Sequence, residues 1–173
     1  LNKIKLFLVI SICLIFFFLT YNDVKSQEPK IIFGKAKVID GDTIKIDKNK
    51  IRLYGIDAPE KKQQCQKMWL SISFLTLNKN YQCGKISSNK LKVKINNKFI
   101  MCKSSNKDRY NRFIAECYKD KININKWMVS NGYAVAYKKY SKKFVVQENI
   151  AKKEKLGLWA GTFEMPWEWR KKN

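Results

Sequence analysis

The sequence of 173 residues contains no histidine. This absence excludes nucleases that use a histidine base, hydrolases built on Ser–His or Cys–His pairs, and most zinc sites. A carboxylate is therefore the obvious candidate for any general base. Arginine is also scarce, since lysine supplies all but four of the 36 basic residues. A site that needs two-point contact with a phosphate has only four candidates, because lysine cannot provide that geometry: Arg52, Arg109, Arg112 and Arg170.

Negative charge is the second shortage. The chain has 14 acidic residues against 36 basic ones, which gives a net charge of +22. A partner with dense negative charge, such as nucleic acid, fits this excess. The alternative is compositional, because the chain is rich in Lys, Asn and Ile throughout. We see no internal repeat and no linker, so we expect a single domain over residues 27–173.

The first 26 residues have the layout of a secretory signal peptide. Two lysines precede an apolar run over residues 6–19, and a Val-Lys-Ser cleavage pattern precedes Gln27. The run is shorter than the roughly 20 apolar residues of a membrane span. We therefore expect cleavage and export to the periplasm or the medium, with an uncleaved membrane anchor as the alternative. Cleavage removes three lysines and one aspartate, which lowers the net charge from +22 to +20.

Residues 38–60 hold the polar side chains that are best suited to chemistry. Two apolar alternations, over residues 43–46 and 51–56, flank a polar tetrapeptide. This pattern predicts a β-hairpin whose turn is centred between Lys48 and Asn49.

The predicted register brings polar side chains of the hairpin together. Asp42 then faces Gly55, and Lys45 faces Arg52. Asp57 lies two positions beyond Gly55, roughly 7 Å along the strand. A modest curl puts both aspartates within reach of one cation. Calcium accepts two carboxylates together with a backbone carbonyl and waters.

Glu60 and Arg52 add to this pair of aspartates. A cation and an arginine neutralise charge on phosphorus oxygens, while a spare carboxylate positions or deprotonates a water. Taken singly, each side chain has an ordinary structural explanation, such as a solvated turn or an arginine that covers a sheet. Their combination on one hairpin favours phosphoryl chemistry.

Three segments resemble the signature segments of the staphylococcal nuclease (thermonuclease) family. They are residues 38–43 (Val-Ile-Asp-Gly-Asp-Thr), 52–60 (Arg-Leu-Tyr-Gly-Ile-Asp-Ala-Pro-Glu) and 108–112 (Asp-Arg-Tyr-Asn-Arg). Their order and spacing match over about residues 35–159. The resemblance implies an α+β OB fold, a small five-stranded barrel with about three helices. It also implies calcium-dependent hydrolysis of DNA or RNA at the 5′ oxygen, leaving 3′-phosphate ends.

The resemblance further implies a set of carboxylates with separate roles. Asp42 and Asp57 match the calcium ligands, and the carbonyl of Ala58 is a third. Asp40 matches a residue just behind them. Glu60 matches the residue that handles the attacking water, directly or through a second water. The metal itself is fixed no further than an oxygen-ligated divalent cation.

Arginines and tyrosines complete the set that the resemblance implies. Arg52 and Arg112 match the residues that hold the scissile phosphate and stabilise charge in the transition state. Tyr110 and Tyr137 match positions near the substrate pocket. Asn111 stands where the family commonly has glycine, a mild departure because asparagine also accepts a left-handed backbone.

The rest of the chain shows further strand and helix patterns. Strands are expected over residues 31–38, 98–103 and 112–119, and helices over residues 84–95, 122–131 and 141–156. Ser141 is expected to cap the last helix and Gly157 to end it. Residues 69–77 form an apolar run of undetermined type. The tail, residues 158–170, holds three of the five tryptophans and is expected to pack on the barrel, with nucleic-acid stacking as the alternative.

Four cysteines remain after residue 26, an even count that fits an oxidising compartment. They allow three pairings. We favour Cys65–Cys83, which pins the segment after Glu60, and Cys102–Cys117, which joins two neighbouring strands. Four reduced thiols are the alternative if the chain is not exported.

Two other functions compete with catalysis. A non-catalytic nucleic-acid-binding module could use the same fold, but such modules typically lose the metal carboxylates or the arginines, and this chain keeps both. A basic protein that binds acidic surfaces leaves the hairpin unexplained. We therefore expect a monomeric nuclease that acts on DNA, RNA or both.

Overall fold

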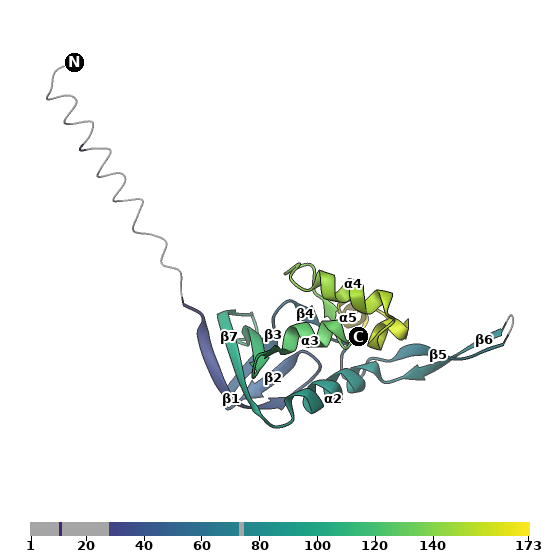
Figure 1. The fold of residues 1–173 in the computed structure, drawn as a ribbon, viewed down its shortest axis with the longest axis horizontal. Helices are drawn as coiled ribbons and strands as arrows, with labels where there is room; N and C mark the ends of the chain where they lie inside the picture. Colours follow the sequence, from purple (N-terminus) through teal and green to yellow (C-terminus); the bar gives the residue numbers. More distant parts are fainter. Residues whose placement is uncertain (1–10, 12–27, 73–74) are drawn as a thin grey trace, which may run out of the picture.

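The computed structural model describes residues 11, 28–72 and 75–173 (Figure 1). The predicted export signal thus lies outside the described residues, Ser11 excepted. Five strands pair in the order β3-β2-β1-β7-β8, and parallel pairing of β3 with β8 closes them into a barrel. This confirms the expected OB-fold barrel. Its strands are β1 (Lys30–Val38), β2 (Thr43–Ile46), β3 (Asn49–Leu53), β7 (Phe99–Lys107) and β8 (Phe113–Lys119).

Shorter elements surround the barrel. The remaining strands are β4 (Ile56–Asp57), β5 (Cys65–Ile72), β6 (Leu75–Tyr81), β9 (Ile122–Asn123), β10 (Val135–Ala136) and β11 (Gly161–Thr162). The helices are α2 (Cys83–Ile95), α3 (Ile124–Ser130), α4 (Val145–Lys153), the 3-10 helix η1 (Gly157–Ala160) and α5 (Pro166–Lys172). Helix α5 exceeds the three expected. In the part of the chain described, no helix has the length and apolar character needed to cross a membrane.

The core follows the alternation seen in the sequence. Ile44 and Ile46 of β2 and Ile51 and Leu53 of β3 all point inward and are fully buried. Because side chains alternate across a strand, the residues between them point to the outer surface of the barrel. The two apolar alternations thus specify the inner face of the hairpin.

The β2–β3 hairpin has a different register from the predicted one. Thr43 pairs with Arg52, so paired residue numbers sum to 95 and not 97. Lys45 consequently faces Lys50 and not Arg52. The cause is a tighter, two-residue turn in which Asp47 adopts a φ of 50°. Aspartate tolerates this left-handed conformation better than most residues, which lets the chain reverse early.

Helices α2 and α3 lie close to their predicted positions. Helix α2 begins one residue before the predicted start and ends where expected. Helix α3 begins at Ile124, two residues late, because the preceding two residues pair with β8 as β9. The side chain of Asn123 caps α3 by accepting a hydrogen bond from the N–H of Lys126.

Helix α4 is shorter than predicted, and Ser141 does not cap it. The Ser141 hydroxyl accepts a hydrogen bond from the N–H of Lys143 within the preceding loop. The helix starts only after Phe144, whose side chain is buried in the core. Its end also comes early, because Lys155 takes a φ of 52° before the predicted stop at Gly157.

Within the apolar run over residues 69–77, residues 69–72 belong to β5 and residues 75–77 to β6. These two strands form a hairpin that projects away from the barrel (Figure 1). A disulfide joins Cys65, at the start of β5, to Cys83, the first residue of α2, with a Cα separation of 5.6 Å. A second disulfide joins Cys102 of β7 to Cys117 of β8, which are direct cross-strand partners. The structure therefore contains both of the favoured cross-links.

The tail packs back on the rest of the fold, as expected. Leu158 lies in a second apolar cluster with the Cys65–Cys83 disulfide, and Trp159 packs against this cluster. Trp167 of α5 stacks on Tyr137, with ring centroids 5.6 Å apart and planes within 10°. These contacts hold α5 against the segment that follows β10.

Candidate active site

Asp42 lies in the loop that joins β1 to β2. Its N–H donates a hydrogen bond to Oδ1 of Asp40 at 3.0 Å, which turns the loop tightly. The Gly41 backbone packs against Ala58, since a Cβ on Gly41 would lie 2.6 Å from the Cβ of Ala58. The side chain of Asp42 is therefore held beside the end of β4.

Arg52 joins the two aspartates of the predicted metal site. Its Nη1 donates to Oδ1 of Asp42 and its Nη2 to Oδ1 of Asp57, both at 2.7 Å. Asp42 lies beside Leu53, whose N–H donates to the Asp42 carbonyl at 2.8 Å, and not opposite Gly55 as predicted. The predicted and observed registers differ by two residues, but the predicted site is unchanged. A shift of two residues keeps side chains on the same face of a strand.

Both aspartates are removed from solvent. Asp42 is 4% exposed and Asp57 is completely buried. Beyond Arg52, Asp42 accepts hydrogen bonds from the N–H of Ala58 and the hydroxyl of Thr43, each at 3.0 Å. Buried carboxylates are tolerated when they are paired and hydrogen-bonded in this way.

Arg170 is a member of the site that the sequence reasoning missed. Its Nη2 donates to Oδ2 of Asp57 at 2.7 Å, and its Nη1 donates to Oε1 of Glu60 at 2.9 Å. It comes from α5, 113 residues after Asp57, so no local pattern connects the two. The scarcity of arginine was the available signal, because Arg52 belongs to the same small set.

Burial and neighbouring charges together set the pKa values of these groups. Burial raises the pKa of Asp57, and the ion pairs with Arg170 and Arg52 only partly offset it. Burial also opposes ionisation of Arg52, but Asp42 and Asp57 raise its pKa above the ordinary value. The pKa of Asp40 is raised to about 6, first by burial and then by the negative charge of Asp42.

Glu60 lies at the edge of the cluster, with about a third of its side chain exposed. Its N–H donates to Oε1 of the buried Gln63, and Nε2 of Gln63 donates to the carbonyl of Glu164 at 2.7 Å. Gly84 of α2 packs so closely on the Glu60 carbonyl that a Cβ would come within 1.8 Å. The loop that carries Glu60 is thus fixed by both α2 and the tail.

Arg112 is not among the partners of the carboxylate cluster. Its Nε and Nη2 bind Oδ2 of Asp108 at 2.8 and 2.7 Å, in the turn between β7 and β8. Asn111 holds the left-handed position in that turn, with a φ of 61°. The two predicted phosphate-binding arginines therefore lie on β3 and directly before β8, which pairs with β3, and they have different acidic partners.

The two tyrosines differ in their surroundings. Tyr137 lies near Asp57, and burial followed by the charge of Asp57 raises its pKa. Tyr110 is mostly exposed, and the guanidinium of Arg112 lies 5.4 Å from its ring centre. Tyr137 thus borders the carboxylates, whereas Tyr110 accompanies Arg112.

The donor set fits a hard divalent cation. Asp42, Asp57 and the Ala58 carbonyl provide only oxygen ligands, which calcium prefers. The arrangement differs from a closed protein cage, since no group of three or more acidic, cysteine or histidine side chains among the described residues could hold a metal ion. Four carboxylates and two guanidiniums meet in the cluster, so acidic groups outnumber basic ones by two.

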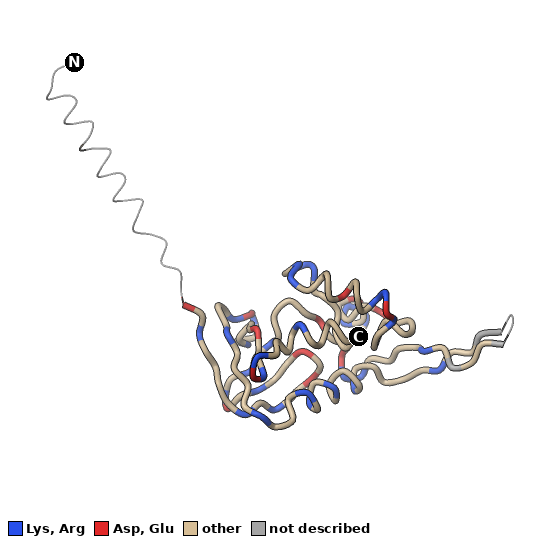
Figure 2. Tube along the Cα trace, in the orientation of Figure 1, with Lys and Arg blue, Asp and Glu red and all other residues tan. Residues whose placement is uncertain are grey.

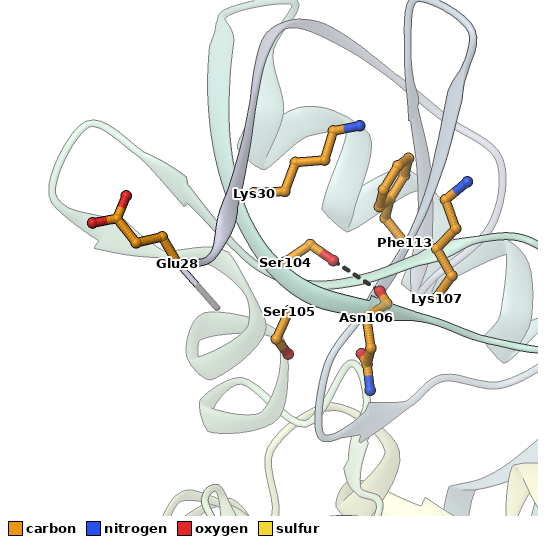
Figure 3. A pocket seen from close by; sticks show the side chains of 7 residues that line it. All are labelled: Glu28, Lys30, Ser104, Ser105, Asn106, Lys107 and Phe113. Atoms are coloured by element: carbon orange, nitrogen blue, oxygen red, sulfur yellow. Dashed lines mark hydrogen bonds between the residues drawn. The ribbon is translucent and has the colours of Figure 1, made fainter. Parts of the chain in front are cut away.

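A hollow of about 380 Å³ lies elsewhere, at the ends of β1 and β7 (Figure 3). It has a single acidic side chain, and that side chain points away from the others (Figure 3). It therefore lacks the paired carboxylates of the candidate site. Its lining residues are Glu28, Lys30, Ser104, Ser105, Asn106, Lys107 and Phe113.

The chain matches a known protein family. The family described as "Staphylococcal nuclease homologue" matches residues 50–161. This range includes Arg52, Asp57, Glu60 and Arg112. It begins after Asp42 and ends before α5, so the match is independent of those two parts of the site.

Several curated proteins are similar over most of the chain. An "Uncharacterized endonuclease" of Escherichia coli O157:H7 is 34% identical over 80% of this chain and 85% of its own length. The "Succinoglycan biosynthesis protein ExoI" of Rhizobium meliloti is 32% identical over 80% of this chain and 69% of its own. The "Probable staphylococcal-like nuclease CAN4" of Oryza sativa is 32% identical over 83% of this chain and 25% of its own.

Proposed function

Because the chain belongs to the family of staphylococcal nuclease homologues, we propose that it is a calcium-dependent nuclease that cuts phosphodiester bonds of DNA, RNA or both. Relatives named as nucleases and endonucleases support nuclease chemistry. One observation carries the assignment of the site: a single guanidinium, Arg52, bonds two buried aspartates at 2.7 Å each.

In this proposal the residues divide the work between binding and proton transfer. Asp42, Asp57 and the Ala58 carbonyl hold the calcium, which when bound supplies positive charge beside the scissile phosphate. Glu60, the most exposed carboxylate of the cluster, accepts a proton from the attacking water, either directly or through a second water.

The arginines of the proposed site act on the phosphate. Arg52 exchanges part of its contact with the aspartates for the phosphate oxygens and stabilises the charge that develops there. Arg112 contributes from the turn between β7 and β8 after loosening its pair with Asp108. A planar guanidinium suits both partners, because carboxylate and phosphate present similar pairs of oxygens.

Cleavage assays test this proposal directly. The purified protein should cut single-stranded DNA, double-stranded DNA or RNA when calcium is present, and a chelator should abolish cutting. Glu60→Gln should slow cutting about a hundredfold or more while nucleic-acid binding persists. Glu154→Gln, an exposed glutamate after α4, is the matched control and should behave as wild type. Absence of cutting with every substrate and cation would favour a binding module instead.

We also propose that residues 1–26 direct export and that the released protein is a monomer. The two disulfides support export, because such bonds persist mainly in oxidising compartments. Sequencing of the secreted protein should start at or near Gln27, and gel filtration should give the mass of one chain. Membrane-bound protein that retains residues 1–26 would favour the anchor.

A further inference from the structure

Two phenylalanines lie stacked and exposed on the outside of the barrel. Phe33 of β1 is 63% exposed and Phe99 of β7 is 53% exposed. Their rings lie 5.3 Å apart with planes within 16° of parallel. The ammonium group of Lys35 lies 5.9 Å from the Phe99 ring centre. Neither ring packs in the core, so fold stability does not explain this exposed aromatic pair.

Lysines extend from the phenylalanines along the same surface. Lys35 and Lys37 share the outer face of β1 with Phe33, because strand side chains alternate with a period of two. Lys37 pairs with Lys45 of β2, and Lys45 pairs with Lys50 of β3. Like charges directly opposite one another destabilise a sheet. This row therefore favours a partner that supplies negative charge.

No counter-charge within the described residues relieves that row. Across residues 28–72 and 75–173, the ion pairs do not include Lys37, Lys45 or Lys50. Lysine and arginine are spread over much of the described trace (Figure 2), but this row is distinguished by direct cross-strand pairing. The surface has both an aromatic and a basic component.

The surface leads from the candidate active site. Arg52 is two residues from Lys50 on the same strand, and Lys37 is four residues from Phe33. At about 3.3 Å per residue along a strand and about 4.8 Å between neighbouring strands, the path from Arg52 across the lysine row to Phe33 covers roughly 30 Å. OB folds bind single strands of about 4 to 16 nucleotides, so this span suits a strand that extends from the scissile phosphate.

We propose that this surface, the aromatic–lysine face, binds the single-stranded nucleic acid that continues beyond the cleavage site. It consists of Phe33, Lys35, Lys37, Lys45, Lys50 and Phe99. The phenylalanines stack on unpaired bases and the lysines contact phosphates. Single strands fit because stacking requires bases that are free of a duplex. The inference rests on the proposed function only for the direction of the strand, since binding itself needs no cleavage.

Binding in the presence of a chelator isolates this face from catalysis. Fluorescence anisotropy should compare a 16-nucleotide single strand, a 4-nucleotide single strand and a 16-base-pair duplex. The Phe33→Ala/Phe99→Ala variant should lose about fivefold or more in affinity for the long single strand. Its affinity for the short strand and the duplex should fall less than twofold.

Two matched controls make the result specific. Val93→Ala, on an exposed position of α2, removes apolar surface elsewhere and should leave affinity unchanged. Unchanged melting temperatures would exclude unfolding as the cause of any loss. The inference is overturned if the double variant binds the long strand as wild type does, or if it loses all three ligands equally.

A cleavage assay separates this inference from the proposed function. If wild type cuts and the variant loses kcat/KM only on long single strands, both stand. If wild type cuts nothing but the length-dependent loss of binding persists, only the proposed function fails. If the variant instead loses binding to anionic lipid vesicles and keeps its affinity for oligonucleotides, the face binds membranes and the inference is wrong.

Discussion

At the scale of single residues, the candidate site is a balance of buried charges. Arg52 and Arg170 between them satisfy three of the four carboxylate oxygens of Asp42 and Asp57. Removing one partner of a buried pair leaves the other charge without compensation, which costs more than the pair contributes. Stability and the proposed catalysis are therefore coupled at this site, although the inner face of the hairpin is apolar.

The first prediction concerns Arg52→Ala. Loss of an arginine that stabilises charge in the transition state should lower kcat/KM about a hundredfold or more. Because Asp42 and Asp57 then remain buried with fewer partners, the free energy of unfolding should also fall by about 3 kcal/mol. Arg109→Ala, which removes an exposed arginine, is the control. A folded Arg52→Ala variant that cuts as fast as wild type would rule out the proposed site.

The second prediction concerns Arg170→Ala, read out as calcium affinity by titration calorimetry. Arg170 forms ion pairs with Asp57 and Glu60, so its positive charge competes with calcium for these carboxylates. Removing it should tighten calcium binding, because a cation then meets a more negative cluster. The neighbouring Lys171→Ala changes the same net charge away from the cluster, where Lys171 pairs with Glu168. Equal effects of the two variants would show that Arg170 has no specific role.

At the scale of elements, the turn between β7 and β8 is organised by one carboxylate. Oδ1 of Asp108 accepts the N–H groups of Tyr110 and Arg112, while Oδ2 binds the Arg112 guanidinium. Burial alone would raise the pKa of Asp108, but these bonds from Arg112 outweigh it and lower the pKa. The ionised form therefore stabilises the folded turn.

The third prediction follows from the sign of that shift. An acid whose pKa is lowered by folding adds stability above its unfolded pKa of about 4, and this stability is lost as pH falls through the lower folded value. Asp108→Asn can keep the bonds of Oδ1 but loses the ion pair. It should lower stability by about 1 kcal/mol or less at pH 7. The difference in melting temperature from wild type should shrink as pH falls below about 4 and vanish below the folded pKa, and a difference that does not change with pH would contradict the assignment.

The fourth prediction concerns the disulfide between β7 and β8. Cys102 and Cys117 are 15 residues apart in the sequence. For a loop of this length, the lost entropy of the unfolded chain stabilises the fold by about 3 kcal/mol. The Cys102→Ala/Cys117→Ala variant should therefore lose about 2–4 kcal/mol in denaturant unfolding. A reductant should lower the stability of wild type further than that of the variant. Identical wild-type curves with and without reductant would show that these thiols are unpaired.

Elements were predictable from the sequence to different degrees. Apolar alternation fixed which residues of β2 and β3 face inward, but the register depended on Asp47 accepting a left-handed turn. The ends of α4 likewise depended on tertiary packing of Phe144 and a positive φ at Lys155. Local patterns encode which face of an element is buried, whereas its length and register respond to contacts that lie outside it.

At the scale of the whole molecule, the site is completed by the end of the chain. Asp42, Asp57 and Glu60 all lie within residues 42–60 and could be identified together. Arg170 could not, because its contacts cross 110 to 113 residues and depend on how α5 packs through Trp167 on Tyr137. Long-range closure of this kind has no periodic or local signature.

The high net charge of the whole molecule limits what a binding measurement alone can show. A net charge of +22 attracts nucleic acid to any face of the protein, so binding by itself does not locate an interface. A comparison of variants in the dependence of affinity on salt does locate one, because each phosphate contact that is lost also removes its release of counterions. For single strands, the logarithm of affinity falls with the logarithm of salt concentration by about 0.7 per contact.

The fifth prediction uses this slope to separate a defined path from diffuse attraction. Lys37→Ala/Lys45→Ala removes two proposed contacts and should reduce the slope for a 16-nucleotide single strand by about 1.4. Lys142→Ala/Lys153→Ala removes the same charge beside α4, where both lysines are exposed, and should change the slope by less than half as much. Both variants carry the same net charge, so any difference must come from position. Equal slopes for the two variants would mean that the long-range field alone attracts the strand, and that no path leads from Arg52 to Phe33.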